Sequence, residues 1–248
     1  MAVIAGNWKM HMGPARARAF FDALDLSGVG DGHDLVVFPP AVAIEAAVGA
    51  AKRAGGRVGV GVQNLYWMDE GAFTGETSAP MAVEAGAGFA LVGHSERRHL
   101  FGESEGDTAL KVGAARRHGL VPVLCVGETL DERKAGRVDE VVLRQLNAAL
   151  PALTSADRRF FVAYEPVWAI GTGETATPAD ASEAHATIRA RLVDALGPAA
   201  ADVPLLYGGS VKPGNAAELL SADEVDGVLV GGASLDPASF AAIARAAG

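Results

Sequence analysis

The segment FFVAYEPVWAIGTG, residues 160–173, joins an apolar run to a carboxylate and then to an apolar loop. Its first five residues are apolar without alternation, which is typical of a strand buried on both faces. Glu165 stands at the end of this run, and Pro166 prevents the strand from continuing. Next comes a stretch that contains a tryptophan and ends in two glycines. A strand of this kind belongs in a parallel sheet covered by helices on its faces.

Similar apolar runs recur along the chain. The expected strands are residues 2–5, 35–38, 58–62, 89–92, 121–126, 160–164, 205–207 and 228–230.

Helical signals separate most of these runs. Pro14 opens one segment of helical spacing, Ser104 precedes another, and Thr177 is followed by a proline and an acid in the first turn. Gly119 and Gly197 lie just past predicted helix ends, where a left-handed residue is favoured. No sequence repeat of fixed period appears, because the strand–helix units vary too much in length.

Strand and helix alternate about eight times in 248 residues, which is the length and order of a closed (β/α)8 barrel. We therefore expect an α/β protein with a single (β/α)8 barrel domain over residues 1–248. A doubly wound sheet is the alternative, because periodicity does not report closure. No linker or composition shift indicates a domain boundary.

Composition narrows the class of protein. A net charge of −9 and a pI near 5.1 argue against a nucleic-acid or anionic-membrane surface. A single cysteine, Cys125, excludes an internal disulfide framework and suits a reducing compartment. The start, MAVIAGNWKM, is a poor signal peptide, and no apolar run approaches the ~18 residues of a membrane helix. We expect a cytoplasmic protein that binds neither nucleic acid nor membrane.

Polar residues and glycines concentrate after the predicted strands. Catalytic groups of such barrels lie at the carboxyl ends of the strands, so these residues mark one site. The segments are GNWKM with Asn7 and Lys9, GHSERR with His94, EPVWAIGTG with Glu165, GGSVKPGN with Ser210, and GGASLDP with Gly231 and Gly232.

These segments carry a resemblance over nearly the whole chain. The motifs NWKM, GAFTGE, GHSERR, YEPVWAIGTG, YGGSV and GGASL occur in the order and spacing of the triosephosphate isomerase family, which the chain resembles. His11 and Met12 depart from the family pattern, in which a small polar residue is expected. The resemblance implies an isomerase that interconverts D-glyceraldehyde 3-phosphate and dihydroxyacetone phosphate through an enediolate, in glycolysis and gluconeogenesis. It also implies that the enzyme needs no cofactor and no metal.

The chemistry of the two titratable candidates suits that reaction. Glu165 is a carboxylate at a strand end beneath an apolar loop, which suits a base that removes a carbon-bound proton; an ordinary ion pair is the alternative. His94 precedes a short predicted helix, whose amides disfavour the imidazolium, so we expect a neutral ring with a lowered pKa that donates to the carbonyl oxygen. His99 lies five residues further on, which does not place the pair on one helical face for a metal.

The remaining site residues suit a phosphate dianion. Lys9, with Asn7 beside it, supplies a local cation in an acidic protein, although a solvated lysine is the alternative. Backbone amides around Ser210, Gly231 and Gly232 are expected to bind the phosphate. The loop after Glu165 is expected to act as a lid, hinged at residues 166–168 and 171–173, with the Gly171 amide on the phosphate.

Three other functions are the alternatives to this isomerase. GTGETA, residues 171–176, matches a loose dinucleotide fingerprint but is separated from its strand. A Schiff-base aldolase shares the phosphate site but needs a nucleophilic lysine where this chain has Glu165. A catalytically silent scaffold is disfavoured because Lys9, His94 and Glu165 are all present. A coupled assay with glyceraldehyde 3-phosphate and no added cofactor distinguishes these readings.

The connection over residues 63–78 is unusually long for a barrel loop and carries Tyr66, Trp67, Met68 and Phe73. Large apolar side chains left in water form a patch that monomers avoid. The loop folding back on its own barrel is the alternative. The resemblance implies a homodimer in which each loop inserts into its mate and brings Thr74 beside the partner's active site.

Overall fold

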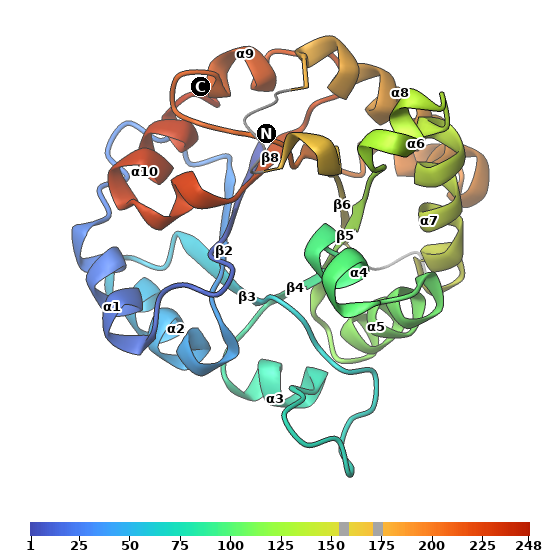
Figure 1. Ribbon diagram of the computed structural model, residues 1–248. Coiled ribbons are helices and arrows are strands. Elements are labelled where there is room, and N and C mark those ends of the chain that lie inside the picture. Colours follow the sequence, from blue (N-terminus) through green and yellow to red (C-terminus); the bar gives the residue numbers. More distant parts are fainter. Residues whose placement is uncertain (154–158, 171–175) are drawn as a thin grey trace.

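The computed structural model describes residues 1–153, 159–170 and 176–248. Over these residues, eight parallel strands pair in chain order, and β1 also pairs with β8, which closes a barrel (Figure 1). Closure confirms the predicted (β/α)8 barrel and excludes the doubly wound sheet, which has two unpaired edges. The strands are β1 (Val3–Asn7), β2 (Asp34–Phe38), β3 (Val58–Val62), β4 (Phe89–Val92), β5 (Val121–Val126), β6 (Phe161–Tyr164), β7 (Leu205–Tyr207) and β8 (Gly227–Val230).

The strands are buried on both faces, as their unbroken apolar runs indicate. One set of side chains fills the barrel, and the alternating set packs under the helices. β3 reads VGVGV because a Cβ on Gly61 would overlap the ring of Phe38 inside the barrel. The barrel core consists of Val3, Ala5, Val36, Phe38, Leu91, Val123, Cys125, Phe161, Ala163, Leu206 and Leu229.

Helices surround the barrel (Figure 1). The α-helices are α1 (Pro14–Ala23), α2 (Ile44–Arg53), α3 (Ala79–Glu84), α4 (Ser95–Phe101), α5 (Glu105–Arg117), α6 (Leu130–Lys134), α7 (Val138–Leu153), α8 (Pro178–Leu196), α9 (Ala216–Leu220) and α10 (Pro237–Arg245). Short 3-10 helices are η1 (Ala41–Ala43), η2 (Val167–Ala169), η3 (Pro198–Asp202) and η4 (Gly232–Leu235). Among the helices of the described ranges, none is long and apolar enough to cross a membrane.

The predicted helix boundaries are mostly correct because capping chemistry sets them. Ser104 caps α5 and Thr177 caps α8, each in a capping box with the aspartate three residues later. Gly119 has a φ of 77°, as expected for a residue past a helix end. Gly197 differs: its φ of 90° and ψ of 176° place it in an extended region open to glycine rather than in the left-handed helical region. The proline after it leads into η3 at once.

The long connection between β3 and α3 projects from the side of the barrel (Figure 1). Tyr66 stacks on Trp67 with ring centroids 4.1 Å apart, and Phe73 packs on Tyr66 at 4.4 Å. Trp67 also packs against the barrel's outer core, whereas Met68 and Phe73 stay exposed. The loop therefore folds back in part and presents its tip to solvent.

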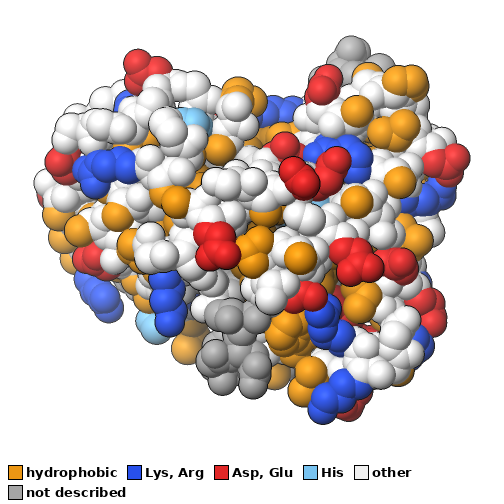
Figure 2. All heavy atoms as spheres, turned by 90° about the horizontal axis from the view of Figure 1, so that it is seen from above, with side chains coloured by type: hydrophobic (Ala, Val, Ile, Leu, Met, Phe, Trp, Pro, Cys, Tyr) orange, Lys and Arg blue, Asp and Glu red, His pale blue; other side chains and the backbone are white. Residues whose placement is uncertain are grey.

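Acidic and basic side chains are interspersed on the face shown in Figure 2, where apolar side chains lie between them. The protein has a net charge of −9, but its acidic side chains do not form one continuous acidic patch on this face.

Candidate active site

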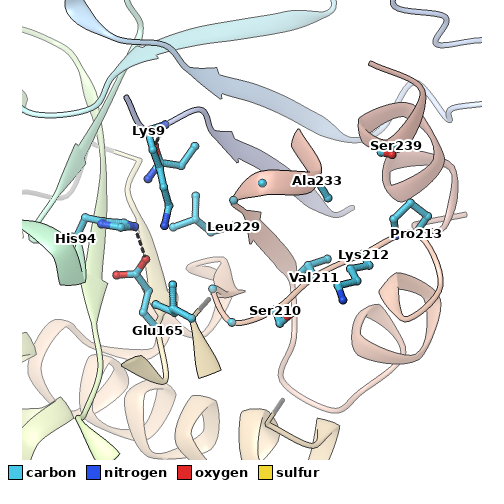
Figure 3. Close-up of a pocket in the computed structure, with 16 residues that line it drawn as sticks. Lys9, His94, Glu165, Ser210, Val211, Lys212, Pro213, Leu229, Ala233 and Ser239 are labelled. Carbon is cyan, nitrogen blue, oxygen red and sulfur yellow. Dashed lines mark hydrogen bonds and ion pairs between the residues drawn. The ribbon is translucent and has the colours of Figure 1, made fainter. Parts of the chain in front are cut away.

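A cavity of about 500 Å³ opens at the carboxyl ends of the strands (Figure 3). The described site residues predicted from the sequence all line it, and they come from β1 and from the segments after β4, β6, β7 and β8. Gly171, predicted to bind the phosphate, lies outside the described residues. The lining residues are Asn7, Lys9, His94, Glu165, Ile170, Gly208, Gly209, Ser210, Val211, Lys212, Pro213, Leu229, Gly231, Gly232, Ala233 and Ser239.

Glu165 is fixed at the end of β6 by its neighbours on both sides. Its backbone N–H donates to the carbonyl oxygen of Val126 over 2.7 Å. A Cβ on Gly127 would overlap the Glu165 carbonyl, and one on Gly208 would lie 2.8 Å from the Glu165 Cγ. Both positions must therefore be glycine for this carboxylate to occupy its place. The sequence alone does not reveal this requirement at Gly127.

The Glu165 carboxylate is 2% exposed and is paired with the neighbouring loop. Its Oε2 accepts a hydrogen bond from the Ser95 backbone N–H over 2.9 Å, and its Oε1 lies 3.0 Å from Nε2 of His94 (Figure 3). Burial, the largest influence, opposes ionisation, but the His94 ring and the Ser95 amide outweigh it and lower the pKa of Glu165. In this arrangement the carboxylate is held as an anion.

His94 is itself the N-cap of α4, with Ser95 as the first helical residue. Its Nδ1 accepts the Glu96 backbone N–H over 3.3 Å, which leaves the proton of a neutral ring on Nε2, facing Glu165. Burial acts against the imidazolium, but the Glu165 carboxylate outweighs it and raises the pKa of His94. The expected lowering of this pKa is therefore wrong for the protein without substrate, because the sequence does not show the 3.0 Å contact between the two side chains.

Lys9 adopts a left-handed backbone conformation with a φ of 49°. The Asn7 side chain accepts the Lys9 backbone N–H, and Nε2 of Gln63 donates to the Lys9 carbonyl over 2.7 Å. The Lys9 ammonium lies 2.6 Å from Oε1 of Glu96. Neither Gln63 nor Glu96 is among the site residues predicted from the sequence. Glu96 stands within the GHSERR motif, whereas the 54-residue separation of Gln63 from Lys9 leaves no local signal.

Two glycine pairs, Gly208–Gly209 and Gly231–Gly232, also line the cavity, and Gly208 lies directly beside Glu165. Gly231 precedes η4 and Gly232 begins it. A Cβ on Gly232 would meet no atom of the described residues within 4 Å. The space beside Gly232 is therefore open to a ligand. Ser210 follows the other pair, and its carbonyl accepts from the Asn215 side chain over 3.0 Å, which fixes the turn.

The start of the predicted lid lies within the described residues, and its second hinge, residues 171–173, lies outside them together with most of GTGETA. Trp168 on η2 donates from Nε1 to Oε1 of Glu128 over 2.8 Å, and the Arg133 guanidinium stacks 4.6 Å from its ring. Ile170 lines the cavity. The loop therefore leaves Glu165 in an anchored turn.

In the part of the chain that the structure describes, no group of three or more His, Cys, Asp or Glu side chains is placed to hold a metal ion. The site's polar groups are instead one carboxylate, one imidazole, ammonium groups and backbone amides. That set suits proton transfer next to a bound anion.

Comparisons with known proteins agree with this geometry. The family model described as triosephosphate isomerase matches residues 2–247. The triosephosphate isomerase of Symbiobacterium thermophilum is 50% identical over 99% of this chain and 96% of its own, and that of Moorella thermoacetica is 51% identical over 97% and 96%. A crystal structure of triosephosphate isomerase from Bartonella henselae aligns with a TM-score of 0.87 and 41% identity, covering 99% of this chain and 98% of the other. The chain belongs to the triosephosphate isomerase family.

Proposed function

We propose that Glu165, His94 and Lys9 carry out the family's reaction in the cavity at the carboxyl ends of the strands. That reaction interconverts D-glyceraldehyde 3-phosphate and dihydroxyacetone phosphate, a step of glycolysis and gluconeogenesis. The chemistry needs one base that reaches two neighbouring carbons and a hydrogen-bond donor for their oxygens. The observation that carries the proposal is the 3.0 Å contact between Glu165 and His94 on the wall of this cavity.

Glu165 acts as the base. Its carboxylate takes the proton from carbon 2 of the aldehyde, the C–H electrons form the C1–C2 double bond, and the carbonyl electrons move onto oxygen 1. His94 transfers its Nε2 proton to oxygen 1 and takes back the proton of the carbon 2 hydroxyl, which moves the negative charge of the enediolate from oxygen 1 to oxygen 2. The proton on Glu165 then returns to carbon 1, which gives the ketone with no net change in the enzyme.

Glu165 must leave its resting partners to do this. Its two oxygens face Ser95 and His94, so the carboxylate has to turn into the cavity before it reaches a substrate carbon. Turning removes the strongest contact that raises the pKa of His94. The Glu96 carboxylate still raises this pKa, whereas burial, Lys9 and the Glu96 amide favour the neutral ring. Substrate binding thus creates the neutral donor that the enediolate needs.

The phosphate occupies the opposite end of the cavity, bound by backbone amides around Ser210, Gly231 and Gly232 and by the Gly171 amide. Open space beside Gly232 supports this assignment. Lys9, with Asn7 fixing its backbone, places positive charge between the phosphate and the reacting oxygens. The base and the anion site are then held at fixed separation by the barrel rim.

The test compares Glu165→Gln with wild type in a coupled assay with glyceraldehyde 3-phosphate and no added cofactor. We expect kcat to fall by more than about 10³-fold, because glutamine cannot accept a proton from carbon. Glu183→Gln is the matched control, since Glu183 is exposed on α8 and lies outside the cavity. Near-normal turnover of Glu165→Gln would remove Glu165 from the mechanism.

We also propose that the protein is a homodimer formed through the loop around Thr74. Outside this loop the structure exposes further apolar side chains, of which Met10 is 94% and Val42 79% exposed. Phe73 and Met68 add to that surface, which a subunit contact would remove from water. Each loop tip would then brace the partner's Asn7–Lys9 segment.

Sedimentation at assay concentration tests the dimer. We expect wild type to sediment as two chains and Phe73→Glu to dissociate and lose activity per subunit while staying folded. Ala217→Glu is the control, because α9 lies on the opposite side of the barrel from the loop (Figure 1). A fully active wild-type monomer would contradict the proposal.

The closed barrel supports a single domain over residues 1–248, since β1 and β8 pair with each other. One cooperative unfolding transition is the expected outcome, and two separate transitions would contradict it. We also infer that the protein is cytoplasmic, from the reaction and from Cys125, which is a free, buried thiol. Cell fractionation that places the activity outside the cytoplasm would overturn it.

A further inference from the structure

A buried glutamine on the outer helix layer contacts the active-site rim from behind. Gln145 lies on α7, which packs against the outside of β5 (Figure 1), and is 4% exposed. Its Oε1 accepts the backbone N–H of Gly127 over 2.8 Å, and its Nε2 donates to the carbonyl of the same Gly127 over 3.1 Å. One side-chain amide thus binds both polar groups of a single residue just past the end of β5.

Gly127 packs directly against the backbone of Glu165. A Cβ there would overlap the Glu165 carbonyl oxygen, so the two backbones are in direct contact. The residues on either side of Gly127 bind the same segment: Val126 accepts the Glu165 N–H over 2.7 Å, and the Glu128 carbonyl accepts the Val167 N–H over 3.0 Å. A shift of Gly127 therefore moves the base and the first turn of the loop after it together.

We propose that Gln145 is a positioning residue for the catalytic base, acting through Gly127. The inference rests on the proposed role of Glu165 and adds a residue outside the cavity to it. Gln145 lines no part of the cavity and contacts neither His94 nor Lys9, so its effect on turnover passes through the backbone.

The side-chain chemistry explains why this position needs a primary amide. Gly127 presents a donor and an acceptor, and only a group that accepts and donates at once satisfies both. An apolar side chain leaves both groups buried without partners, which favours a displacement of the strand end toward other partners. A misplacement of the base by about 1 Å is enough to lower turnover by about 100-fold.

Gln145→Met tests the proposal because methionine keeps the length and volume of the side chain without its hydrogen bonds. We expect kcat to fall by about 10- to 100-fold with KM changed by less than about threefold, since the phosphate site lies on the other wall. Leu146→Ala is the matched control. Leu146 is the next residue of α7 and fully buried, so its truncation lowers the melting temperature without touching Gly127, and kcat should stay within about twofold.

Gln145→Glu gives a second readout that a purely structural role would not produce. A carboxylate accepts from the Gly127 N–H but repels the carbonyl, whereas the protonated carboxylic acid replaces both hydrogen bonds. Burial raises the pKa of such a carboxyl. We therefore expect the kcat of this variant, divided by that of wild type at the same pH, to rise several-fold as the pH falls from about 8 to about 6.

The outcomes separate the inference from the proposed function. If Glu165→Gln retains turnover, the proposed function fails. If Glu165→Gln is inactive while folded Gln145→Met keeps kcat within twofold of wild type and the Gln145→Glu ratio is flat with pH, the positioning role alone is overturned. Failure of both Gln145 variants to fold would also overturn it, since Gln145 would then serve stability and not the placement of the base.

Discussion

His185 makes the stability of the protein depend on pH below neutrality. The side chain lies on α8 and is 0% exposed, with its ring centroid 6.0 Å from that of Tyr164, the residue before Glu165. Its Nδ1 donates to the carbonyl oxygen of Glu224 over 2.8 Å, and within the residues that the structure describes its Nε2 has no hydrogen-bond partner. Burial lowers the pKa of His185 to about 4 and outweighs the nearby Glu224 carbonyl and Asp226, which favour the charged form.

The sign follows from proton binding. The unfolded chain binds a proton at this residue below pH 6.5, whereas the folded protein binds it only near pH 4, so the unfolded state holds more protons between these values. The free energy of unfolding therefore falls as the pH falls through this window and is insensitive to His185 above it. The full effect is about 3 kcal/mol, of which about 2 kcal/mol is already lost at pH 5.0.

The perturbation is His185→Gln, which fills the site with a group that does not titrate. Urea unfolding is followed by far-UV circular dichroism at pH 7.5 and pH 5.0, at one fixed protein concentration. We expect the variant to lose about 2 kcal/mol less than wild type between the two pH values, even if it is less stable at pH 7.5. His99→Gln, a change of an exposed histidine on α4, is the control. Equal losses in wild type and His185→Gln would refute the reasoning.

Four further predictions concern the site. Glu165→Asp should fold and bind substrate normally but lose about 10²–10³ in kcat, because the carboxylate retreats by one methylene; stopped-flow or coupled assays would show it. Nitrogen-15 NMR should find the pKa of His94 raised in wild type and lower in Glu165→Gln, since the variant loses the strongest influence that opposes burial; an unchanged value contradicts the pairing. His94→Gln should keep more activity than His94→Ala, because glutamine retains a donor. Lys212→Gln should lower kcat/KM by about two- to fivefold at low salt and leave kcat unchanged, because Lys212 is exposed at the cavity mouth; a loss that persists in ~0.5 M salt would contradict electrostatic attraction.

The barrel and the composition of its rim are predictable from the sequence because their signals are local. Unbroken apolar runs mark strands buried on both faces. Seven of the eight predicted runs differ from the observed strands by no more than one residue at each end, and β3 and β5 match residue for residue. Once the strands are parallel, their carboxyl ends must share one rim. Asn7, His94 and Glu165, far apart in sequence, therefore meet in one cavity.

The contacts behind the rim are not predictable in this way. Gln63 lies 54 residues from the Lys9 carbonyl that it binds, and Gln145 lies 18 residues from Gly127 on another element. A glutamine in a helix has the same local signal whether it faces solvent or a strand end. The pKa of His94 is a further case, because its direction depends on the rotamer of Glu165, which no periodicity encodes.

The charged side chains of the site are paired with one another, so side chains and backbone amides should have different roles. The Lys9 ammonium is balanced by Glu96 at 2.6 Å, and the His94 ring faces the Glu165 carboxylate at 3.0 Å. These two pairs leave little net charge to attract a phosphate dianion into an acidic protein. Under the proposed function, phosphate binding would then depend chiefly on the backbone amides at Ser210 and the glycine pairs, whose dipoles are unaffected by proton transfer. Under the same proposal, each side-chain pair would separate when the substrate offers a new charge. For this reason substitutions at the amide wall should raise KM, and substitutions in the pairs should lower kcat.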